Sequence, residues 1–279
     1  MKYVITAKGT DDVNSGNGTF DAGTPTFQTE SATELIISRL GLINFLKEGK
    51  IDSNTTIVTL RDRYFLYENI FSNIETYDPK KNYDDCLDLL NDNMFSFLCE
   101  NLPYKPFYQY FDRDKKEILN IKYNDNILKE NLPNFLICIP RFKNSDTRRN
   151  LDKNYWIKFL NLSTSEYEKI FVFGRGSEDM ANEKITHINT FQDFCSYLHH
   201  PNCIDIVSTI SGPCHFAHFF SNTANKTKMT IIDNNNLIEK YGDSPSYFHP
   251  CLNFSKIPIK FINHLISQKE LLYLIKKNN

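Results

Sequence analysis

The segment from Ile204 to Ala217 constrains the fold of this chain more than any other. It predicts a short apolar strand, a Ser-Gly-Pro turn at 211–213 and the start of a helix. Pro213 suits the first turn of a helix, where its missing N–H costs nothing, and Ser211 belongs to the residue types favoured as N-caps. Such a turn directs backbone N–H groups and the positive end of a helix dipole at one point. Many turns of this kind are purely structural, but this one can also bind an anion, above all a phosphate.

Strands and helices alternate throughout the second half of the chain. The predicted strands are 135–140, 169–173, 185–188, 204–208 and 228–233, and the predicted helices are 153–162, 190–199, the one that begins at the Ser-Gly-Pro turn, and 260–276. This alternation is typical of a doubly wound α/β layer architecture with right-handed crossovers. The last helix finds no partner within its own half, and we expect it to pack back on the first half.

The first half shows the same pattern less clearly. A strand at 3–7, an apolar helix that ends near Gly49 and a strand at 55–60 indicate a second parallel sheet. A polar segment at 8–30 separates the first two elements, and loops of that length are usually functional. A further helix is predicted at 83–102.

A strand is also indicated at 118–123, and a domain boundary follows it at 131–134. The chain is therefore expected to form an α/β protein of two Rossmann-like domains. These comprise residues 1–133 and 134–279.

Composition excludes several classes of function. The chain has 279 residues, and its 32 Lys and Arg against 34 Asp and Glu give a net charge of −2. No global positive field therefore attracts nucleic acid, and any anion site must be local. No apolar run approaches the roughly 20 residues that span a bilayer. The seven cysteines are scattered and odd in number, which indicates a reducing compartment, and we expect a cytoplasmic protein.

Basic and glycine residues follow the ends of the predicted strands. In open α/β sheets, ligands bind beyond the carboxyl ends of the strands, and the planar fork of arginine matches a phosphate. The candidates are Arg141, Lys143, Arg148 and Arg149 after the first strand of this half, Gly174 and Arg175 after the second, and Ser211, Gly212 and His215 at the turn. Each of them alone also fits a solvated loop. Their convergence on one edge favours a binding site.

Acidic residues provide the remaining candidates. Glu178 follows the second strand, where an acid often contacts a ribose or base. Asp11 and Asp12 lie in the long first loop, where a general base would face the crevice between the domains. Paired aspartates are also common turn formers, and Asp21 and Glu30 are open as substitutes.

Three other chemistries lack the necessary residues. His215 lies three residues before His218, a spacing that suits a metal pair, but no third and fourth ligand follow at helical spacing, so no metal site is predicted. The sequence also contains no Walker loop and no G-x-S-x-G elbow.

The second half resembles the donor-binding domain of GT-B glycosyltransferases, most nearly the heptosyltransferase-like group of glycosyltransferase family nine. The resemblance is carried by the strand and loop at 135–141, by Trp156, by the strand at 170–174 and by the turn at 209–217. In the family this turn usually contains Asp-Ser/Thr-Gly-x-x-His-x-Ala, and Ile210 stands here in place of the Asp. The first half shares only a strand, a loop with acids and a helix.

The resemblance implies two domains facing a cleft, with a nucleotide-sugar donor on the second and a glycan or glycolipid acceptor on the first. Transfer of a hexosyl or heptosyl group would be inverting and metal-independent, with no cofactor beyond the nucleotide-sugar substrate. Asp11 or Asp12 would deprotonate the acceptor, and the basic residues and the turn would stabilise the departing diphosphate. Membrane contact would be peripheral.

Two other functions remain open. Because Ile210 replaces the family aspartate, the chain also fits a nucleotide-sugar-binding protein of the same fold that has lost catalysis. The second is a different enzyme on a similar scaffold, such as a polysaccharide pyruvyltransferase or a sugar-nucleotide epimerase. Binding of a nucleotide sugar without turnover would distinguish the binding protein from a transferase. Product analysis would identify a different enzyme, since an epimerase needs no acceptor.

Overall fold

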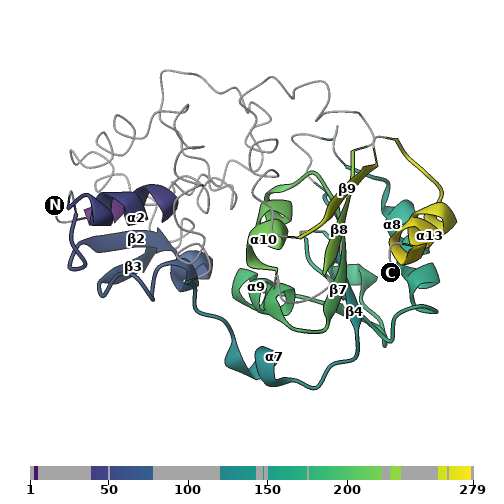
Figure 1. Ribbon diagram of the computed structural model, residues 1–279, viewed down its shortest axis with the longest axis horizontal. Coiled ribbons are helices and arrows are strands. Elements are labelled where there is room, and N and C mark those ends of the chain that lie inside the picture. Colours follow the sequence, from purple (N-terminus) through teal and green to yellow (C-terminus); the bar gives the residue numbers. More distant parts are fainter. Residues whose placement is uncertain are drawn as a thin grey trace. The chain divides into compact units, whose positions relative to one another are not determined.

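The chain forms two compact units, residues 1–122 and 123–279, each built around a parallel β-sheet (Figure 1). The computed structural model describes residues 3–5, 39–49, 51–77, 120–142, 147, 150–174, 176–221, 227–233, 257–262 and 264–277.

The first unit has a three-stranded parallel sheet in the order β1-β2-β3. Its elements are β1 (Tyr3–Ile5), α2 (Leu40–Lys47), β2 (Thr56–Leu60), the 3-10 helix η2 (Arg61–Leu66) and β3 (Ile74–Tyr77). Leu42 of α2, Ile57 of β2 and Leu66 of η2 are fully buried and form part of its core. The strands predicted at 3–7 and 55–60 are confirmed over 3–5 and 56–60, and the helix before Gly49 is confirmed over 40–47, whereas β3 was not predicted.

The second unit has a six-stranded parallel sheet in the order β6-β5-β4-β7-β8-β9. Its elements are α7 (Asp125–Lys129), β4 (Phe135–Ile139), α8 (Lys153–Ser163), β5 (Lys169–Val172), η4 (Glu178–Met180), β6 (Ile185–His187), α9 (Phe191–His199), β7 (Cys203–Thr209), α10 (Gly212–Phe220), β8 (Lys228–Ile232), β9 (Ile259–Ile262) and α13 (Gln268–Lys277). From β4 the chain first builds outward through β5 to β6, and then returns to the other side of β4 to add β7, β8 and β9.

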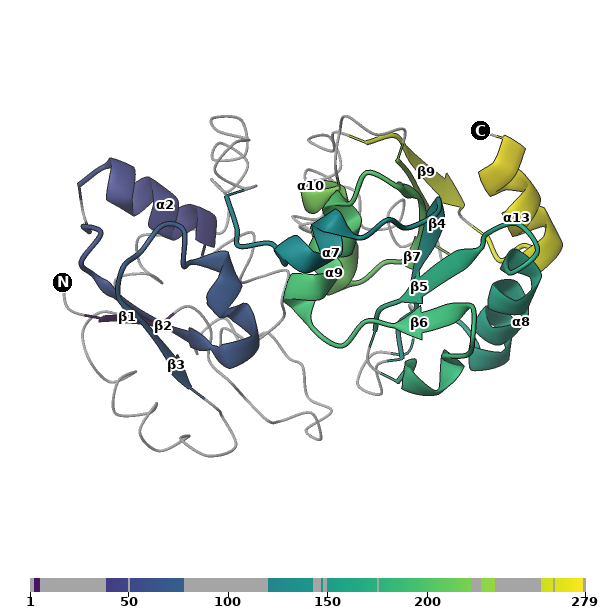
Figure 2. The ribbon, with the colours of Figure 1, turned by 90° about the horizontal axis from the view of Figure 1, so that it is seen from below.

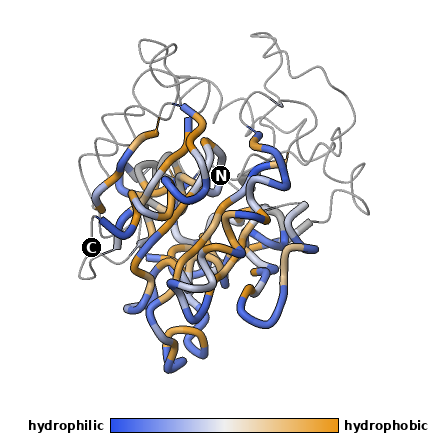
Figure 3. Tube along the Cα trace, turned by 90° about the vertical axis from the view of Figure 1, so that its right-hand side faces the viewer, coloured by the Kyte–Doolittle hydropathy of each residue, from blue (hydrophilic) through white to orange (hydrophobic). Residues whose placement is uncertain are grey.

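Helices cover both faces of this sheet (Figure 2). Helices α8 and α13 lie on one face, and α9 and α10 lie on the other. All five residues of β4 are buried because both faces are covered. Figure 3 shows hydrophobic stretches of the chain alternating with hydrophilic ones. This layering confirms the doubly wound architecture expected for the second half.

The end of the chain differs from its prediction. Residues 259–262 form β9, which pairs with β8, so the predicted helix at 260–276 begins only at Gln268. Helix α13 packs on α8 of its own unit, and Tyr155 Oη donates a hydrogen bond to Ile266 O at 3.0 Å. The expected packing of this helix on the first half is therefore corrected to packing within the second.

The division between the units falls between Lys122 and Tyr123, ahead of the boundary placed at 131–134. The described residues 120–123 contain no strand, so the strand indicated at 118–123 is wrong for that part. Helix α7 and the loop after it belong to the second unit. The predicted helix at 83–102 and the long loop at 8–30 lie outside the described residues.

Candidate functional site

The candidate site lies at the carboxyl ends of β4 and β7, two neighbouring parallel strands. Ile139 of β4 pairs with Ser208 of β7, so the residues that follow them, Arg141 and Ser211, leave the sheet at the same edge. The connection after β4 runs through α8 on one face, and the connection after β7 runs through α10 on the other. Diverging connections of this kind create the crevice in which doubly wound sheets bind ligands.

Helix α10 begins at this edge with an N-cap serine whose side chain does not cap it. Ser211 has extended backbone torsions (φ −154°, ψ 166°), and its hydroxyl accepts no hydrogen bond from the helix. Helix α8 differs, because Asp152 Oδ1 accepts from the N–H groups of Asn154 (2.7 Å) and Tyr155 (3.3 Å). Thr190 likewise caps α9. The start of α10 is thus left without the side-chain acceptor that its neighbours have.

Two hydroxyl groups at this edge are buried without a hydrogen-bond partner. Thr209, the last residue of β7, is 0% exposed, and Ser211 is 5% exposed. Within the ranges that the structure describes, neither Oγ1 of Thr209 nor Oγ of Ser211 makes a hydrogen bond. A buried polar group left unpaired costs roughly 1–3 kcal/mol, so folded proteins rarely keep one without a reason. A ligand that accepts or donates hydrogen bonds here would supply the missing partner.

Arg141 is held in place at the end of β4. It is only 8% exposed, and its Nη1 donates a hydrogen bond to Asn150 Oδ1 at 2.7 Å. Asn150 lies in the connection to α8, and its own N–H donates to Thr147 O at 3.0 Å. A guanidinium group fixed by its surroundings is already oriented for the parallel hydrogen bonds it makes to phosphate or carboxylate.

Gly174 brings the end of β5 against the end of β4. Its φ is 158°, and a Cβ atom at this position would collide with Pro140 O. Its own carbonyl accepts hydrogen bonds from Ser177 N (3.2 Å) and Ser177 Oγ (2.5 Å), which close the turn after β5. Gly174 therefore has a packing role at this edge beside its predicted role in donor binding.

Glu178 begins η4 just beyond that turn and is solvent-exposed. Hydrogen bonds from backbone N–H groups, first its own and then that of Gly176, hold the pKa of its carboxyl below the usual range. The neighbouring Asp179 pairs with Lys153 of α8 at 2.6 Å. Both pair members are exposed, so this contact contributes little to stability.

The structure describes part of the predicted site. It places Arg141, Gly174, Ser211 and Gly212 at the ends of adjacent strands. The remaining predicted residues Asp11, Asp12, Lys143, Arg148, Arg149 and Arg175 lie outside the described residues, and the side chain of His215, in α10, is also outside them. Sequence reasoning missed Thr209 and Asn150. A hydroxyl residue at the end of an apolar strand was a usable signal for Thr209, whereas the position of Asn150 depends on how a loop returns to Arg141.

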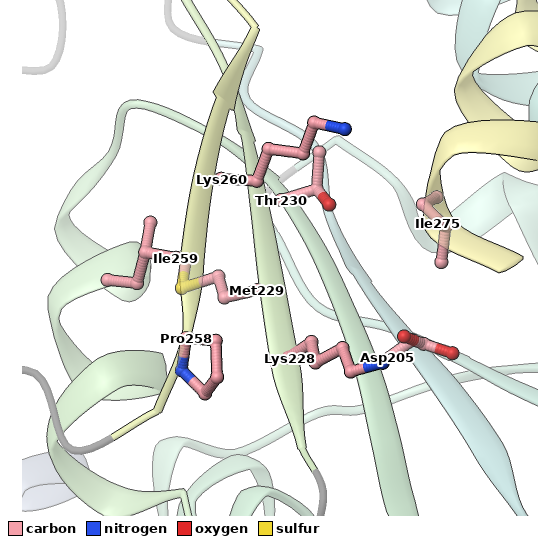
Figure 4. Close-up of a pocket in the computed structure, with 8 residues that line it drawn as sticks. All are labelled: Asp205, Lys228, Met229, Thr230, Pro258, Ile259, Lys260 and Ile275. Carbon is pink, nitrogen blue, oxygen red and sulfur yellow. The ribbon is translucent and has the colours of Figure 1, made fainter. Parts of the chain in front are cut away.

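A separate pocket of ≈ 300 Å³ lies toward the opposite ends of the strands. It is lined by Asp205, Lys228, Met229, Thr230, Pro258, Ile259, Lys260 and Ile275 (Figure 4). Asp205 is buried and accepts a hydrogen bond from Tyr167 Oη at 2.6 Å, and Figure 4 shows Lys228 pointing toward it. Burial and the Asp205 charge raise the pKa of Tyr167, so the phenol stays a donor. The hydrogen bond between Tyr167 and Asp205 pairs two buried polar groups within the protein, which indicates a structural role.

The described residues show neither a metal cluster nor reactive thiols. No three His, Cys, Asp or Glu side chains among them are grouped to hold a metal ion. Cys138, Cys203 and Cys214 are fully buried, and burial raises their thiol pKa, for Cys214 to about 12. No helix in the described ranges is long and apolar enough to cross a membrane.

Comparison with known proteins identifies a similar fold. No protein-family model matches the chain, and no curated protein matches its sequence. The structure is similar to that of the ADP-heptose LPS heptosyltransferase II from E. coli, with a TM-score of 0.53 and 8% sequence identity. The match covers 88% of this chain and 96% of the other. At so low an identity the similarity shows the fold alone: the chain has an α/β fold with parallel sheets like that of a heptosyltransferase.

Proposed function

We propose that this protein is a glycosyltransferase that moves a sugar from a nucleotide-sugar donor to a hydroxyl group of a glycan or glycolipid. One observation carries the proposal: the unpartnered buried hydroxyls of Thr209 and Ser211 stand at the uncapped start of α10, at the strand switch point. The fold, similar to that of a heptosyltransferase, supports the same class of reaction.

The chemistry of this edge suits a diphosphate. The start of a helix carries a partial positive charge of roughly +0.5, and hydroxyl groups donate hydrogen bonds to phosphate oxygens. Arg141, fixed by Asn150, adds a full positive charge at the end of the neighbouring strand. Together these groups favour the negative charge that a nucleotide sugar carries and that grows on its diphosphate as the sugar leaves.

The proposed transfer is a single inverting displacement. The acceptor hydroxyl oxygen bonds to the anomeric carbon from one side while the bond from that carbon to the diphosphate oxygen breaks on the other. The electron pair of the broken bond stays on the diphosphate, whose charge the α10 start and Arg141 stabilise. The acceptor proton passes to a carboxylate, for which Asp11 and Asp12 are the proposed bases.

Donor binding is tested by thermal unfolding with UDP-, GDP-, ADP-, CMP- and dTDP-sugars. A ligand that binds only the folded state at 100 times its Kd adds about 2.7 kcal/mol to stability, which raises the melting temperature. We expect one nucleotide class to do so. Incubation of that donor with glycan acceptors should then yield a glycoside of inverted anomeric configuration. If no nucleotide sugar shifts the melting temperature, the proposal fails.

The role of Thr209 is tested by comparison with Thr227, another fully buried threonine of the same sheet region. Thr227 Oγ1 donates to Cys203 O at 2.6 Å. Thr227→Val should therefore cost roughly 1 kcal/mol of stability and leave donor affinity unchanged. Thr209→Val removes a hydroxyl without a protein partner, so it should leave the free protein as stable or more so and weaken donor binding. Equal effects of the two variants would assign Thr209 a structural role only.

A second candidate function rests on Ile210. Its side chain is 5% exposed at the position where the resembling family carries an aspartate. A buried isoleucine offers no hydrogen bond to a donor sugar, which favours a protein that binds nucleotide sugars without transferring them. Donor binding by calorimetry together with the absence of glycoside or hydrolysis products would support this second candidate.

A further inference from the structure

The two units are joined by one covalent connection, between Lys122 and Tyr123. Connections between domains are often polar tethers of several residues, and the segment at 131–134 looks like one in the sequence. The contacts on each side of the Lys122–Tyr123 peptide show a different arrangement.

Hydrogen bonds and burial hold the chain to the first unit as far as Lys122. Arg39, which is fully buried, donates from Nε to Leu66 O (2.7 Å) and from Nη2 to Asn120 O (3.0 Å). Ile121 is 3% exposed, and the N–H of Lys122 donates to Phe65 O at 3.1 Å. Three consecutive residues are thus fixed to the first unit.

Ring stacking and hydrogen bonds hold the chain to the second unit from Tyr123 onward. The ring of Tyr123 stacks on His199 of α9, with centroids 4.6 Å apart and planes at 22°. The N–H of Asn124 donates to Ser196 Oγ, and its side-chain amide donates to Asp193 Oδ1, each at 2.8 Å. Helix α9 therefore holds both residues that follow the connection.

The segment at 131–134 is held as well. His200 Nε2 lies 3.1 Å from Glu130 O, while His200 Nδ1 accepts from Asn202 N at 3.1 Å, which assigns the proton to Nε2. The side-chain amide of Asn202 donates to Leu132 O. Both flanks of this loop are therefore anchored to the second unit, so it cannot act as a tether.

We propose that the Lys122–Tyr123 link is a hinge confined to a single peptide connection. Any rotation of one unit relative to the other is absorbed by the ψ torsion of Lys122 and the φ torsion of Tyr123, since the residues before and after are held by opposite units. Hinges of this type use a few loop positions that need not be glycine.

The hinge is tested by measuring the distance distribution between the units in the full chain. Spin labels are attached through non-natural amino acids at the exposed positions Asn69 and Lys158, because the chain has seven cysteines of its own. Insertion of two glycines between Lys122 and Tyr123 adds a reach of about 8 Å and should broaden the distribution by a comparable amount. The same insertion after Asn131 should leave it unchanged.

Substitutions at the hinge provide a second test if the insertion impairs folding. Tyr123→Ala removes the stack on His199 and should broaden the distribution, whereas Tyr123→Phe keeps the ring and should not. Equal broadening by the two insertions would mean that the whole segment is a flexible tether. No broadening by either hinge variant would mean that the link does not govern the orientation of the units. Both results overturn the proposal, and neither depends on the proposed transferase activity.

Discussion

Two helices of the second unit, α10 and α13, begin after a serine, and the two serines are used differently. At α13, Ser267 and Glu270 form a reciprocal capping box: the N–H of Ser267 donates to Glu270 Oε2 at 2.9 Å, and the N–H of Glu270 donates to Ser267 Oγ at 3.3 Å. At α10, Cys214 stands three residues after Ser211, and the Ser211 hydroxyl has no partner among the described residues. The first serine stabilises its own helix, whereas the hydroxyl of the second makes no hydrogen bond within the described part of the chain.

This difference separates structural polar groups from candidate binding groups. Ser267 is exposed, and its hydroxyl still forms hydrogen bonds within its own helix. Ser211 is buried, and its hydroxyl forms none with α10. Water readily satisfies an exposed hydroxyl, but a buried one has no such substitute. The start of α10 is therefore the candidate binding region that the described residues of the second unit favour.

The largest expected effect concerns the turn after β5, at the same carboxyl edge of the sheet as the start of α10. Gly174→Ala should reduce the free energy of unfolding by about 3 kcal/mol, because the added Cβ would collide with Pro140 O. Gly49→Ala is the matched control: its φ of 68° is also positive, but nothing lies within 4 Å of the added atom. It should cost only about 1 kcal/mol. Urea denaturation measures both, and a Gly174 loss no greater than the Gly49 loss would contradict the close approach of β5 to β4.

Arg141→Ala should weaken nucleotide-sugar binding by about 2 kcal/mol, or roughly 30-fold, because a charged hydrogen-bond donor is lost from the phosphate site. Arg141→Lys keeps the charge but loses the planar fork, so its loss should be smaller. Isothermal calorimetry measures the affinities. Unchanged affinity in the alanine variant would remove Arg141 from the candidate site and leave it a structural role at the end of β4.

The comparison of the two serines is tested directly by alanine substitution. Ser267→Ala should cost roughly 1 kcal/mol of stability by removing the cap of α13. Ser211→Ala should cost none, because the hydroxyl makes no hydrogen bond, and should instead reduce donor affinity several-fold. Thermal unfolding and calorimetry on both variants decide the matter. A stability loss at Ser211 equal to that at Ser267 would show that the two serines have the same structural role.

The smallest expected effect is a pH dependence of the α13 cap. Hydrogen bonds from Ser267, first from its side chain and then from its backbone, hold the pKa of Glu270 below its ordinary 4.5. A lowered folded-state pKa adds stability that is fully present above the unfolded value and is lost as the pH falls through the folded value. Glu270→Gln should therefore flatten the loss of stability below pH 4.5, while Glu168→Gln, an exposed control, should not. Parallel acid-unfolding curves for Glu270→Gln and the unmodified chain would contradict the capping box.

Most strands and helices of the second unit were predictable because the sequence patterns that specify them are local. The apolar runs of β4, β5 and β7, the N-cap residues Asp152 and Thr190, and the Ser-Gly-Pro turn each act within a few residues. They therefore predict the strands and helices without knowledge of the rest of the chain.

β9 was missed for the opposite reason. A short apolar run at 259–262 suits a strand or the start of a helix equally well, and only its pairing with β8 decides between them.

In the candidate site, too, some features follow from local sequence and others depend on tertiary contacts. Sequence alone determined that a helix begins after Ser211 and that arginine and glycine follow neighbouring strand ends, since turn chemistry depends on adjacent residues. Only the tertiary structure decided that β4 and β7 lie side by side, that Asn150 fixes Arg141, and that the hydroxyls of Thr209 and Ser211 are buried without partners. Strand order and burial arise from contacts between residues far apart in the chain, which no local pattern specifies.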